Sequence, residues 1–472
     1  MVEILKPVKH KKLGIEAIHG HTCIELKDVR TGIRDRIESD NIVTDGAEYL
    51  LNMHGGLLYW NRATIGSNEI VPIAANLFGG LLLFNDTIPT SPTPAKFMPA
   101  GVKMIGNGSY KMSNSGVVTE MGSYNEPESV LTHNKFEQVY DFSTQQANGT
   151  IKSVCLTSRV GGWAGYGNSN SESFLDANKA SVGSNGNPMY ALTNWCGTRG
   201  YAFYDNKVVG INNDAIPQNA TSVTLMEYAV PHALYDNFTA IPLVASTNSL
   251  GDPSDTYEVA IPQYNNYRYA KARNSKIYIS PNVGGNIVNN ASFTISVIDV
   301  SNRSVVNKTL INSTGKTIRG ADNASVAFAP VADDILWAVT MDNYIVVIDL
   351  AHETVALSNI QLNANSPAYI AEFAPGLIAL SASSAPSAFT SVVSLYDITN
   401  GTIYPTNLTA TPERYDSIYQ YDAVTDMLKH AYQSNVRLMP HPWRLTTINN
   451  LGSDVTKDAT KTMKVTYTLT FS

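Results

Sequence analysis

The sequence contains little cysteine and little charge. Its 472 residues include three cysteines, Cys23, Cys155 and Cys196, with no CxxC pair, and a small odd number argues against a disulfide framework. Charged residues make up 15% of the chain, well below the roughly 25% of an average soluble domain. The net charge is −7 and the one basic run, 6–12, is a short terminal stretch, so no nucleic-acid partner is expected.

Long apolar runs and catalytic motifs are also missing. The longest apolar stretch, 71–84, is interrupted by Pro72 and by Gly79-Gly80. It is shorter than the roughly 20 residues of a membrane helix, so we expect a buried segment and no membrane insertion. The first residues lack the apolar core of a signal peptide, which predicts assembly in a reducing cytosol. No GxSxG, HExxH or P-loop motif occurs, so we expect no catalytic site, cofactor or metal ion.

The second half of the chain contains a pattern that occurs three times. Each copy is an apolar strand ending in Asp, then three or four turn-forming residues, then a second β-branched strand. The aspartates, Asp299, Asp349 and Asp397, lie 50 and 48 residues apart, a period typical of β-propeller blades. A residue that recurs once per blade has a structural task, such as capping a turn with its side-chain oxygen. We therefore interpret these carboxylates as turn caps and not as a catalytic pair. The copies are 296–306, 346–355 and 394–403.

The repeat predicts an all-β fold with a β-propeller in residues 186–445. A period near 50 over this span gives about five to seven blades. A propeller has to close on itself, because an open ring leaves unpaired strand edges. We expect the segment 443–448 to close the ring by pairing with the first blade.

The two ends of the chain are also predicted to be β-structure. Residues 1–185 are expected to form a β-rich anchoring domain that opens with a hairpin over 22–43. A second hairpin is expected over 136–156, around the Asn148-Gly149 turn signal. In the C-terminal segment, 446–472, apolar and polar residues alternate from Met463 onward. This alternation predicts a half-buried strand, which we expect to return to the N-terminal hairpin and complete that domain.

One cluster of aromatic and amide side chains is a candidate glycan contact. Aromatic faces stack on sugar rings, and amides hydrogen-bond to hydroxyl groups. The same tyrosines would also serve to pack neighbouring blades together, and the pattern leaves both interpretations open. The cluster consists of Tyr264, Asn265, Asn266, Tyr267 and Tyr269.

Two further features have a plain structural interpretation. His19, His21 and Cys23 share one face of a strand and are possible metal ligands, but the sequence supplies no fourth ligand, which favours an ordinary strand.

The proline-rich stretch 87–99 predicts an extended loop or an arm that clasps a neighbouring subunit.

Segments at both ends resemble tail and appendage proteins of phages and prophages of Gram-positive gut bacteria. The resemblance implies a virion structural protein of the tail tip, baseplate or fibre, with other virion proteins as partners and no catalytic residues. It does not extend to the repeats. The segments that carry it are Ile24–Val29 with Thr31-Gly32, Asp40–Thr44, Tyr140–Thr144, Ala147–Ile151, Val154–Thr157 and Thr460–Leu469.

Three functions are consistent with these patterns. The first is a virion protein that displays a propeller for recognition of host-surface glycan, as a homo-oligomer. The second is a non-adhesive capsid or baseplate appendage that docks other proteins. The third is a virion-associated glycan hydrolase. The absence of a catalytic motif favours the first two, which place the protein on the virion after assembly in the host cytoplasm.

Overall fold

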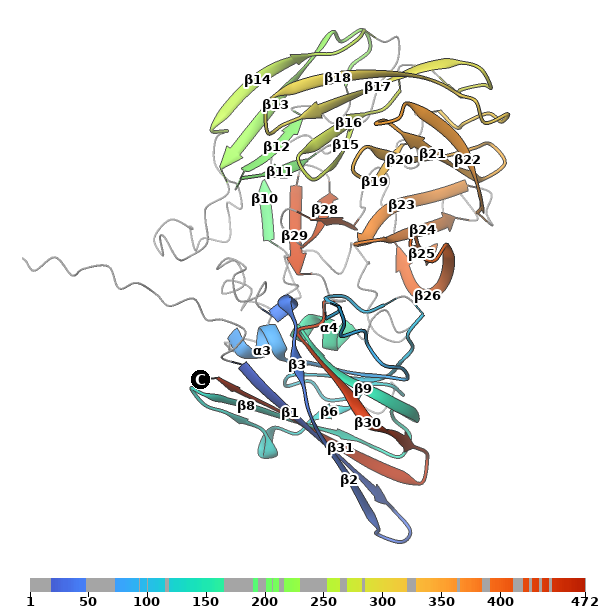
Figure 1. Ribbon diagram of the computed structural model, residues 1–472. Coiled ribbons are helices and arrows are strands. Elements are labelled where there is room, and N and C mark those ends of the chain that lie inside the picture. Colours follow the sequence, from blue (N-terminus) through green and yellow to red (C-terminus); the bar gives the residue numbers. More distant parts are fainter. Residues whose placement is uncertain are drawn as a thin grey trace, which may run out of the picture. The chain divides into compact units, whose positions relative to one another are not determined.

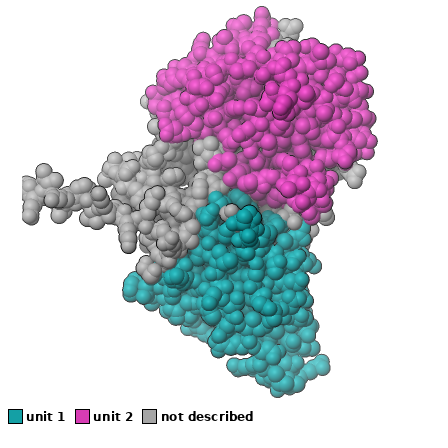
Figure 2. All heavy atoms as spheres, viewed as in Figure 1, with its two compact units in different colours: residues 1–53, 71–165, 442–472 teal, residues 54–70, 166–441 magenta. Residues whose placement is uncertain are grey.

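The computed structural model divides into two compact units, shown in Figure 2. Unit 1 combines residues 1–53, 71–165 and 442–472, and unit 2 combines residues 54–70 and 166–441. The boundaries predicted from the sequence lie near 185 and 445. The structure describes residues 18–47, 73–92, 94–99, 101–114, 119–164, 190–193, 201–205, 207–211, 216–229, 253–263, 270–281, 285–320, 328–362, 366–383, 391–410, 419–423, 427–432, 435–440 and 444–471.

Unit 1 is built on two antiparallel sheets, which we call sheets A and B (Figure 1). Sheet A has the strand order β2-β1-β31-β8-β6, with β7 also pairing with β8, and sheet B has the order β3-β30-β9-β4-β5. The strands of sheet A are β1 (Ile18–Asp28), β2 (Arg34–Asp40), β6 (Ser123–Tyr124), β7 (Val130–Leu131), β8 (Lys135–Phe142) and β31 (Lys461–Phe471). Those of sheet B are β3 (Ile42–Val43), β4 (Gly80–Phe84), β5 (Met104–Ser109), β9 (Gly149–Thr157) and β30 (Thr447–Lys457).

The C-terminal strand lies in the middle of sheet A. β31 pairs with β1 along its whole length, from Ile18 opposite Phe471 to Asp28 opposite Lys461, as the alternation in the sequence predicts. Its alternating apolar residues from Met463 to Leu469, including Val465 and Tyr467, are buried because they face sheet B. The hydroxyl of Tyr467 lies 2.5 Å from Thr447 Oγ1 in sheet B. The apolar face of β31 therefore forms part of the core between the two sheets.

The predicted hairpin over 136–156 is wrong. β8 pairs with β31 in sheet A, whereas β9 pairs with β30 and β4 in sheet B. Both strands are buried along most of their length, and pairing in opposite sheets lets both contribute to the same core. Asn148 and Gly149 instead lie where the chain passes from β8 in sheet A into β9 in sheet B, and Gly149 has a φ of 150°.

The described part of the apolar stretch 71–84 is mostly buried, as expected, and supplies both a helix and a strand. Among the described residues, α3 (Ile73–Phe78) leads through Gly79 into β4, all of whose residues are buried. Residues 45–47 are also helical, and the other described helices of unit 1 are α4 (Arg159–Ala164) and the 3-10 helix η3 (Glu126–Glu128). No helix in the described part of the chain is long and apolar enough to cross a membrane.

Unit 2 contains five antiparallel sheets of four strands each, numbered I to V here. Sheets I to IV are each made of four consecutive strands (Figure 1). Sheet I is β11 (Ala202–Tyr204), β12 (Lys207–Ile211), β13 (Ser222–Ala229) and β14 (Asp255–Ala260). Sheet II is β15 (Ala270–Arg273), β16 (Lys276–Ile279), β17 (Ser292–Asp299) and β18 (Ser304–Ile311). Sheet III is β19 (Ala329–Ala332), β20 (Ile335–Val339), β21 (Tyr344–Asp349) and β22 (Thr354–Gln361). Sheet IV is β23 (Ser366–Ala374), β24 (Leu377–Ser383), β25 (Ser391–Asp397) and β26 (Thr402–Ala410).

Sheets I to IV pack face to face in chain order, because the strands carry apolar residues on both faces. In sheet II, Ile277 and Ile279 pack against sheet I, while the intervening Tyr278 packs against sheet III. In sheet III, Leu336 packs against sheet II and Trp337 packs against sheet IV. Each inner sheet is thus a layer between two apolar cores.

The prediction that the segment 443–448 pairs with the first blade is wrong. Its residues from Thr447 onward belong to β30 of unit 1. In unit 2 the early strand β10 (Tyr190–Thr193) pairs with the late strand β29 (Asn435–Pro440). Sheet V therefore joins the beginning of the unit to its end, in the order β10-β29-β28-β27. Its other strands are β27 (Tyr419–Asp422) and β28 (Met427–Tyr432).

Candidate functional site

The predicted glycan contacts cannot be placed. Tyr264, Asn265, Asn266, Tyr267 and Tyr269 lie outside the described residues. They fall between β14 of sheet I and β15 of sheet II in the sequence.

The three repeated aspartates lie at the turns between the third and fourth strands of sheets II, III and IV. In each turn, one carboxylate oxygen accepts hydrogen bonds from backbone N–H groups two or three residues further on. In sheet III these bonds, together with the His352 ring, hold the pKa of Asp349 below its ordinary value. These bonds take the place of hydrogen bonds from the turn amides to water, and they hold the turn in one conformation. The acceptor bonds are Ser301 N to Asp299 (3.0 Å), His352 N to Asp349 (2.9 Å), and Thr399 N and Asn400 N to Asp397 (2.8 and 3.2 Å).

A second position of the same turns was not recognised in the sequence. The fourth residue after each Asp has a positive φ: 59° at Arg303, 55° at Glu353 and 65° at Gly401. A glycine at all three sites would have revealed the left-handed position. Arg and Glu conceal it, although the spacing from Asp is constant.

A buried ionic cluster connects the first strands of three sheets. Arg273 at the end of β15 donates from Nε and Nη2 to the two carboxylate oxygens of Glu372 on β23, at 2.6 and 3.1 Å. It also pairs with Asp333, in the turn after β19. The side chains of Arg273 and Glu372 are 11% and 4% exposed. Sheets II and IV are not neighbours in the stack, so this bond spans the first strand of sheet III.

A second ionic cluster connects the last three strands of sheet I to the turn between β17 and β18 of sheet II. Glu227 on β13 has a side chain that is 3% exposed and lies 2.5 Å from Lys207 Nζ. Arg303, in the turn of sheet II, reaches both Glu227 at 3.3 Å and Asp255 at 2.5 Å. The guanidinium also lies 4.3 Å from the ring centre of Tyr257. Both clusters pair buried carboxylates with cations and are structural in geometry.

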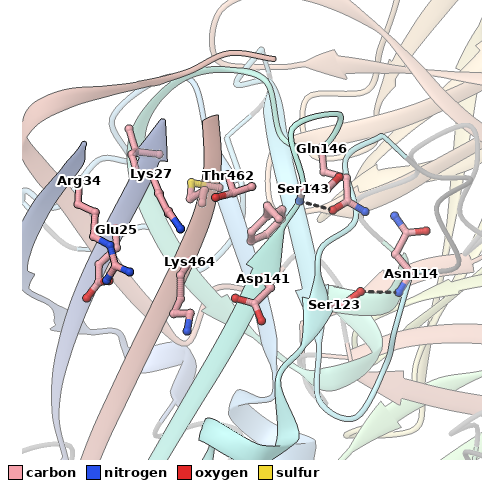
Figure 3. A pocket seen from close by; sticks show the side chains of 13 residues that line it. Glu25, Lys27, Arg34, Asn114, Ser123, Asp141, Ser143, Gln146, Thr462 and Lys464 are labelled. Carbon is pink, nitrogen blue, oxygen red and sulfur yellow. Dashed lines mark hydrogen bonds between the residues drawn. The ribbon is translucent and has the colours of Figure 1, made fainter. Parts of the chain in front are cut away.

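An open groove lies in unit 1, over sheet A (Figure 3). Its volume is about 570 Å³. Three charged residues on adjacent strands cross it in register, with Glu25 of β1 opposite Lys464 of β31 and Lys464 opposite Asp141 of β8. The other lining residues are Leu26, Lys27, Arg34, Asn114, Ser123, Phe142, Ser143, Gln146, Thr462 and Met463.

Several charges of the groove already have partners. Lys464 Nζ donates to Glu128 Oε2 at 2.5 Å, and this bond, together with the nearby carboxylates of Asp141 and Glu25, raises the pKa of Lys464. The same bond lowers the pKa of Glu128. Asp141 accepts a hydrogen bond from Asn125 Nδ2 at 2.7 Å. A groove with cations, carboxylates, amides and hydroxyls is suited to holding a polar ligand.

The His19, His21 and Cys23 side chains do not form a metal site. His21 Nδ1 lies 2.9 Å from Asp40 on β2, and Cys23 is buried at 7% exposure, where burial raises the pKa of its thiol. Across the described ranges, no group of three or more His, Cys, Asp or Glu residues is arranged to hold a metal ion.

Comparisons with known proteins give no family. No family model matches the chain, and no curated protein matches it. A streptogramin B lyase structure is similar at 12% identity, covering 53% of this chain and 96% of that one, with a TM-score of 0.26. An oligogalacturonate lyase in complex with manganese is similar at 11% identity, covering 66% and 76%, with a TM-score of 0.26. U3-55K is similar at 9% identity, covering 53% and 80%, with a TM-score of 0.25. With TM-scores this low, none of them carries an inference about this chain.

Proposed function

We propose that this chain is a structural and adhesion protein of a phage virion. In this proposal unit 1 anchors the protein to the particle, and unit 2 is a five-bladed β-propeller that binds a host-surface glycan. The protein is non-enzymatic and works as a homo-oligomer beside other virion proteins.

Two features of unit 2 support a propeller. Five four-stranded sheets, the last completed by the earliest strand β10, match blades closed by a shared sheet. The bond between Arg273 and Glu372 supports a common axis, because the first strands of non-adjacent sheets meet only when they gather around one. Sheets II, III and IV would then be blades, with the aspartate turns at their third and fourth strands.

The observation that carries the virion assignment is where the phage-like segments lie. They are far apart in the sequence, yet β1, β31 and β8 are consecutive neighbours in sheet A, and β3 and β9 belong to sheet B. The larger part of unit 2, residues 166–441, is inserted in the sequence between β9 and β30 of the same unit. The resemblance thus coincides with one folded module, which fits an anchor shared among appendages and carrying an inserted recognition domain.

The virion assignment is tested on particles. Particles of the phage or induced prophage that encodes this chain, banded by density, should contain it at a fixed copy number by quantitative mass spectrometry. Antibodies against the chain should label the tail in electron micrographs. Absence of the chain from infectious particles would overturn the assignment.

The adhesion assignment is tested on cells. The full chain should bind host cells saturably, and purified cell-wall glycan should compete. Substituting Tyr264, Tyr267 and Tyr269 by Ala should reduce this binding while the melting profile stays that of the parent. Tight binding to another virion protein without cell binding would indicate a docking appendage, and release of reducing sugar would indicate a hydrolase.

A further inference from the structure

Strand β2 forms one edge of sheet A, and its outer side is unpaired among the described residues. It pairs only with β1, from His21 opposite Asp40 to Lys27 opposite Arg34. Residues 34–40 are exposed except for Ile37 and Ser39, which are half-buried. An open strand edge of this kind is a template for pairing with another chain.

The backbone groups that point outward can be identified from the pairing with β1. Asp28 N donates to Ile33 O, and Asn41 N donates to Gly20 O. Hydrogen-bonded residues alternate along an antiparallel pair, so the odd-numbered residues from 33 to 41 face β1. The even-numbered residues 34, 36, 38 and 40 therefore direct their N–H and C=O groups to the free edge.

The charges on this edge are complementary to themselves when the strand is reversed. The sequence from 34 to 40 is Arg-Asp-Arg-Ile-Glu-Ser-Asp. In an antiparallel pair of two copies centred on Ile37, Arg36 of one copy faces Glu38 of the other, and Arg34 faces Asp40. Each contact occurs twice because of the two-fold axis.

The neighbouring registers have fewer opposite-charge pairs. Only the even-numbered residues direct backbone groups to the free edge, so even-numbered residues must face even-numbered residues of the other copy. The allowed registers therefore have two-fold axes that lie one residue apart. Centring on Arg36 pairs Arg34 with Glu38 of the other copy but places Arg36 opposite its own copy. Centring on Glu38 pairs Arg36 with Asp40 but places Glu38 opposite its own copy. Like charges directly opposite each other are destabilising in a sheet, so charge selects the register centred on Ile37.

We propose that β2 is a homodimer interface, in which the β2 strands of two copies pair antiparallel about Ile37 and join their A sheets into one. In the monomer, the Arg36 and Glu38 side chains already lie on the face where they would meet the second copy. Arg36 is paired with Glu38 of its own strand and lies 3.9 Å from Glu25, all on the outer face. Pairing exchanges exposed contacts within one chain for the same contacts between chains and adds backbone hydrogen bonds.

The ends of the strand supply apolar contact. Ile33 and Ile42 flank β2 and are 63% and 45% exposed. Antiparallel pairing brings the beginning of each β2 to the end of the other. In the register centred on Ile37, Ile33 of one copy lies opposite Asn41 of the second copy, so pairing covers part of the exposed Ile33 side chain at each end of the interface.

A charge-reversal series on the full chain tests the proposal. By sedimentation velocity, the parent should show a monomer–dimer equilibrium, and Arg36→Glu and Glu38→Arg should each weaken it at least about tenfold, because each contact occurs twice. The double variant carrying both changes should recover the parent affinity. An equimolar mixture of the two single variants should form heterodimers, since positions 36 and 38 then carry opposite charges across both contacts.

Cysteine substitutions test the register. Two Cys residues replacing Ile37 would lie opposite each other across a non-hydrogen-bonded pair, about 4.5 Å apart at Cα, which suits a disulfide. The matched control, Ser39→Cys, lies on the same face but about 13 Å from its copy. Ile37→Cys alone should form a crosslinked dimer on mild oxidation. A monomeric parent at all accessible concentrations, or equal crosslinking of both variants, overturns the proposal.

Discussion

Removing the carboxylate of Glu372 should destabilise unit 2 specifically. The side chain of Arg273 is 11% exposed and donates two hydrogen bonds to Glu372. Truncating Glu372 to Ala leaves the Arg273 guanidinium buried. Its remaining acid partner in the cluster is then Asp333, whose side chain is 64% exposed. Breaking one side of a buried ion pair costs roughly 3–5 kcal/mol, and we expect about 3 kcal/mol because Asp333 stays.

The assay is thermal and urea unfolding of the full chain. At about 2 °C per kcal/mol for a unit of this size, Glu372→Ala should lower the melting temperature of the unit 2 transition by about 6 °C. The transition of unit 1 should not move. Tryptophan fluorescence can follow unit 2 through Trp337 in its core when Trp163 and Trp443, which belong to unit 1, are replaced by Phe.

The double variant Arg273→Met with Glu372→Leu is the matched control. It removes both charges together and replaces them with apolar volume, which is often neutral or stabilising. We expect it to restore most of the lost stability. If Glu372→Ala costs less than about 1 kcal/mol, or if the double variant is as unstable as the sum of the single ones, the two residues are not coupled. The contact between sheets II and IV would then be absent.

Three further substitutions have defined outcomes. Tyr467→Phe removes a buried hydroxyl 2.5 Å from Thr447 Oγ1 and should lower the stability of unit 1 by about 1–2 kcal/mol in urea unfolding. Glu353→Gly should raise the melting temperature of unit 2, because it relieves about 1 kcal/mol of left-handed backbone strain and loses only an exposed pair with Lys308. Lys457 is 1% exposed, and burial lowers its pKa to about 8 from 10.5. Since the unfolded state then holds more protons, stability should rise between pH 8 and 10.5, and Lys457→Met should remove that rise.

For each of these three substitutions, one result would contradict the expectation. Equal stability of Tyr467→Phe and the parent would mean that the hydroxyl bond is offset by water in the unfolded chain. A lower melting temperature for Glu353→Gly would mean that its contact with Lys308 outweighs the strain. A flat pH profile of the parent above pH 8 would mean that Lys457 keeps its charge.

The sequence predicted elements whose pattern is local. Alternation from Met463 to Leu469 requires one buried and one exposed face, and it located β31 correctly. The repeats around Asp299, Asp349 and Asp397 located the third and fourth strands of three sheets, because a polar turn between two β-branched strands is visible in a short window. The all-β class follows from these two signals.

The parts that depend on pairing between distant segments could not be predicted. The hairpin over 136–156 had a strong turn signal, but the burial of both β8 and β9 is satisfied by placing them in opposite sheets. The closing segment was placed at 443–448 because it is strand-like and follows the last repeat, whereas the strand that pairs with the end of unit 2 is β10, which has four residues. The groove over sheet A joins Glu25, Asp141 and Lys464, and only the register of three strands brings them together.

The ionic clusters explain how a chain with so few charges can order sheets that resemble one another. Apolar faces such as those of sheets I to IV fit many partners, so burial alone does not determine which sheet lies beside which. The charged contacts differ from one pair of sheets to another: Arg303 with Glu227 between sheets I and II, Lys308 with Glu353 between II and III, and Arg273 with Glu372 between II and IV. A misplaced sheet would bury Glu227 or Glu372 without its cation, at a cost of several kcal/mol. We infer that these pairs contribute to the order of the sheets more than to net stability, which is why the double variant at 273 and 372 should remain stable.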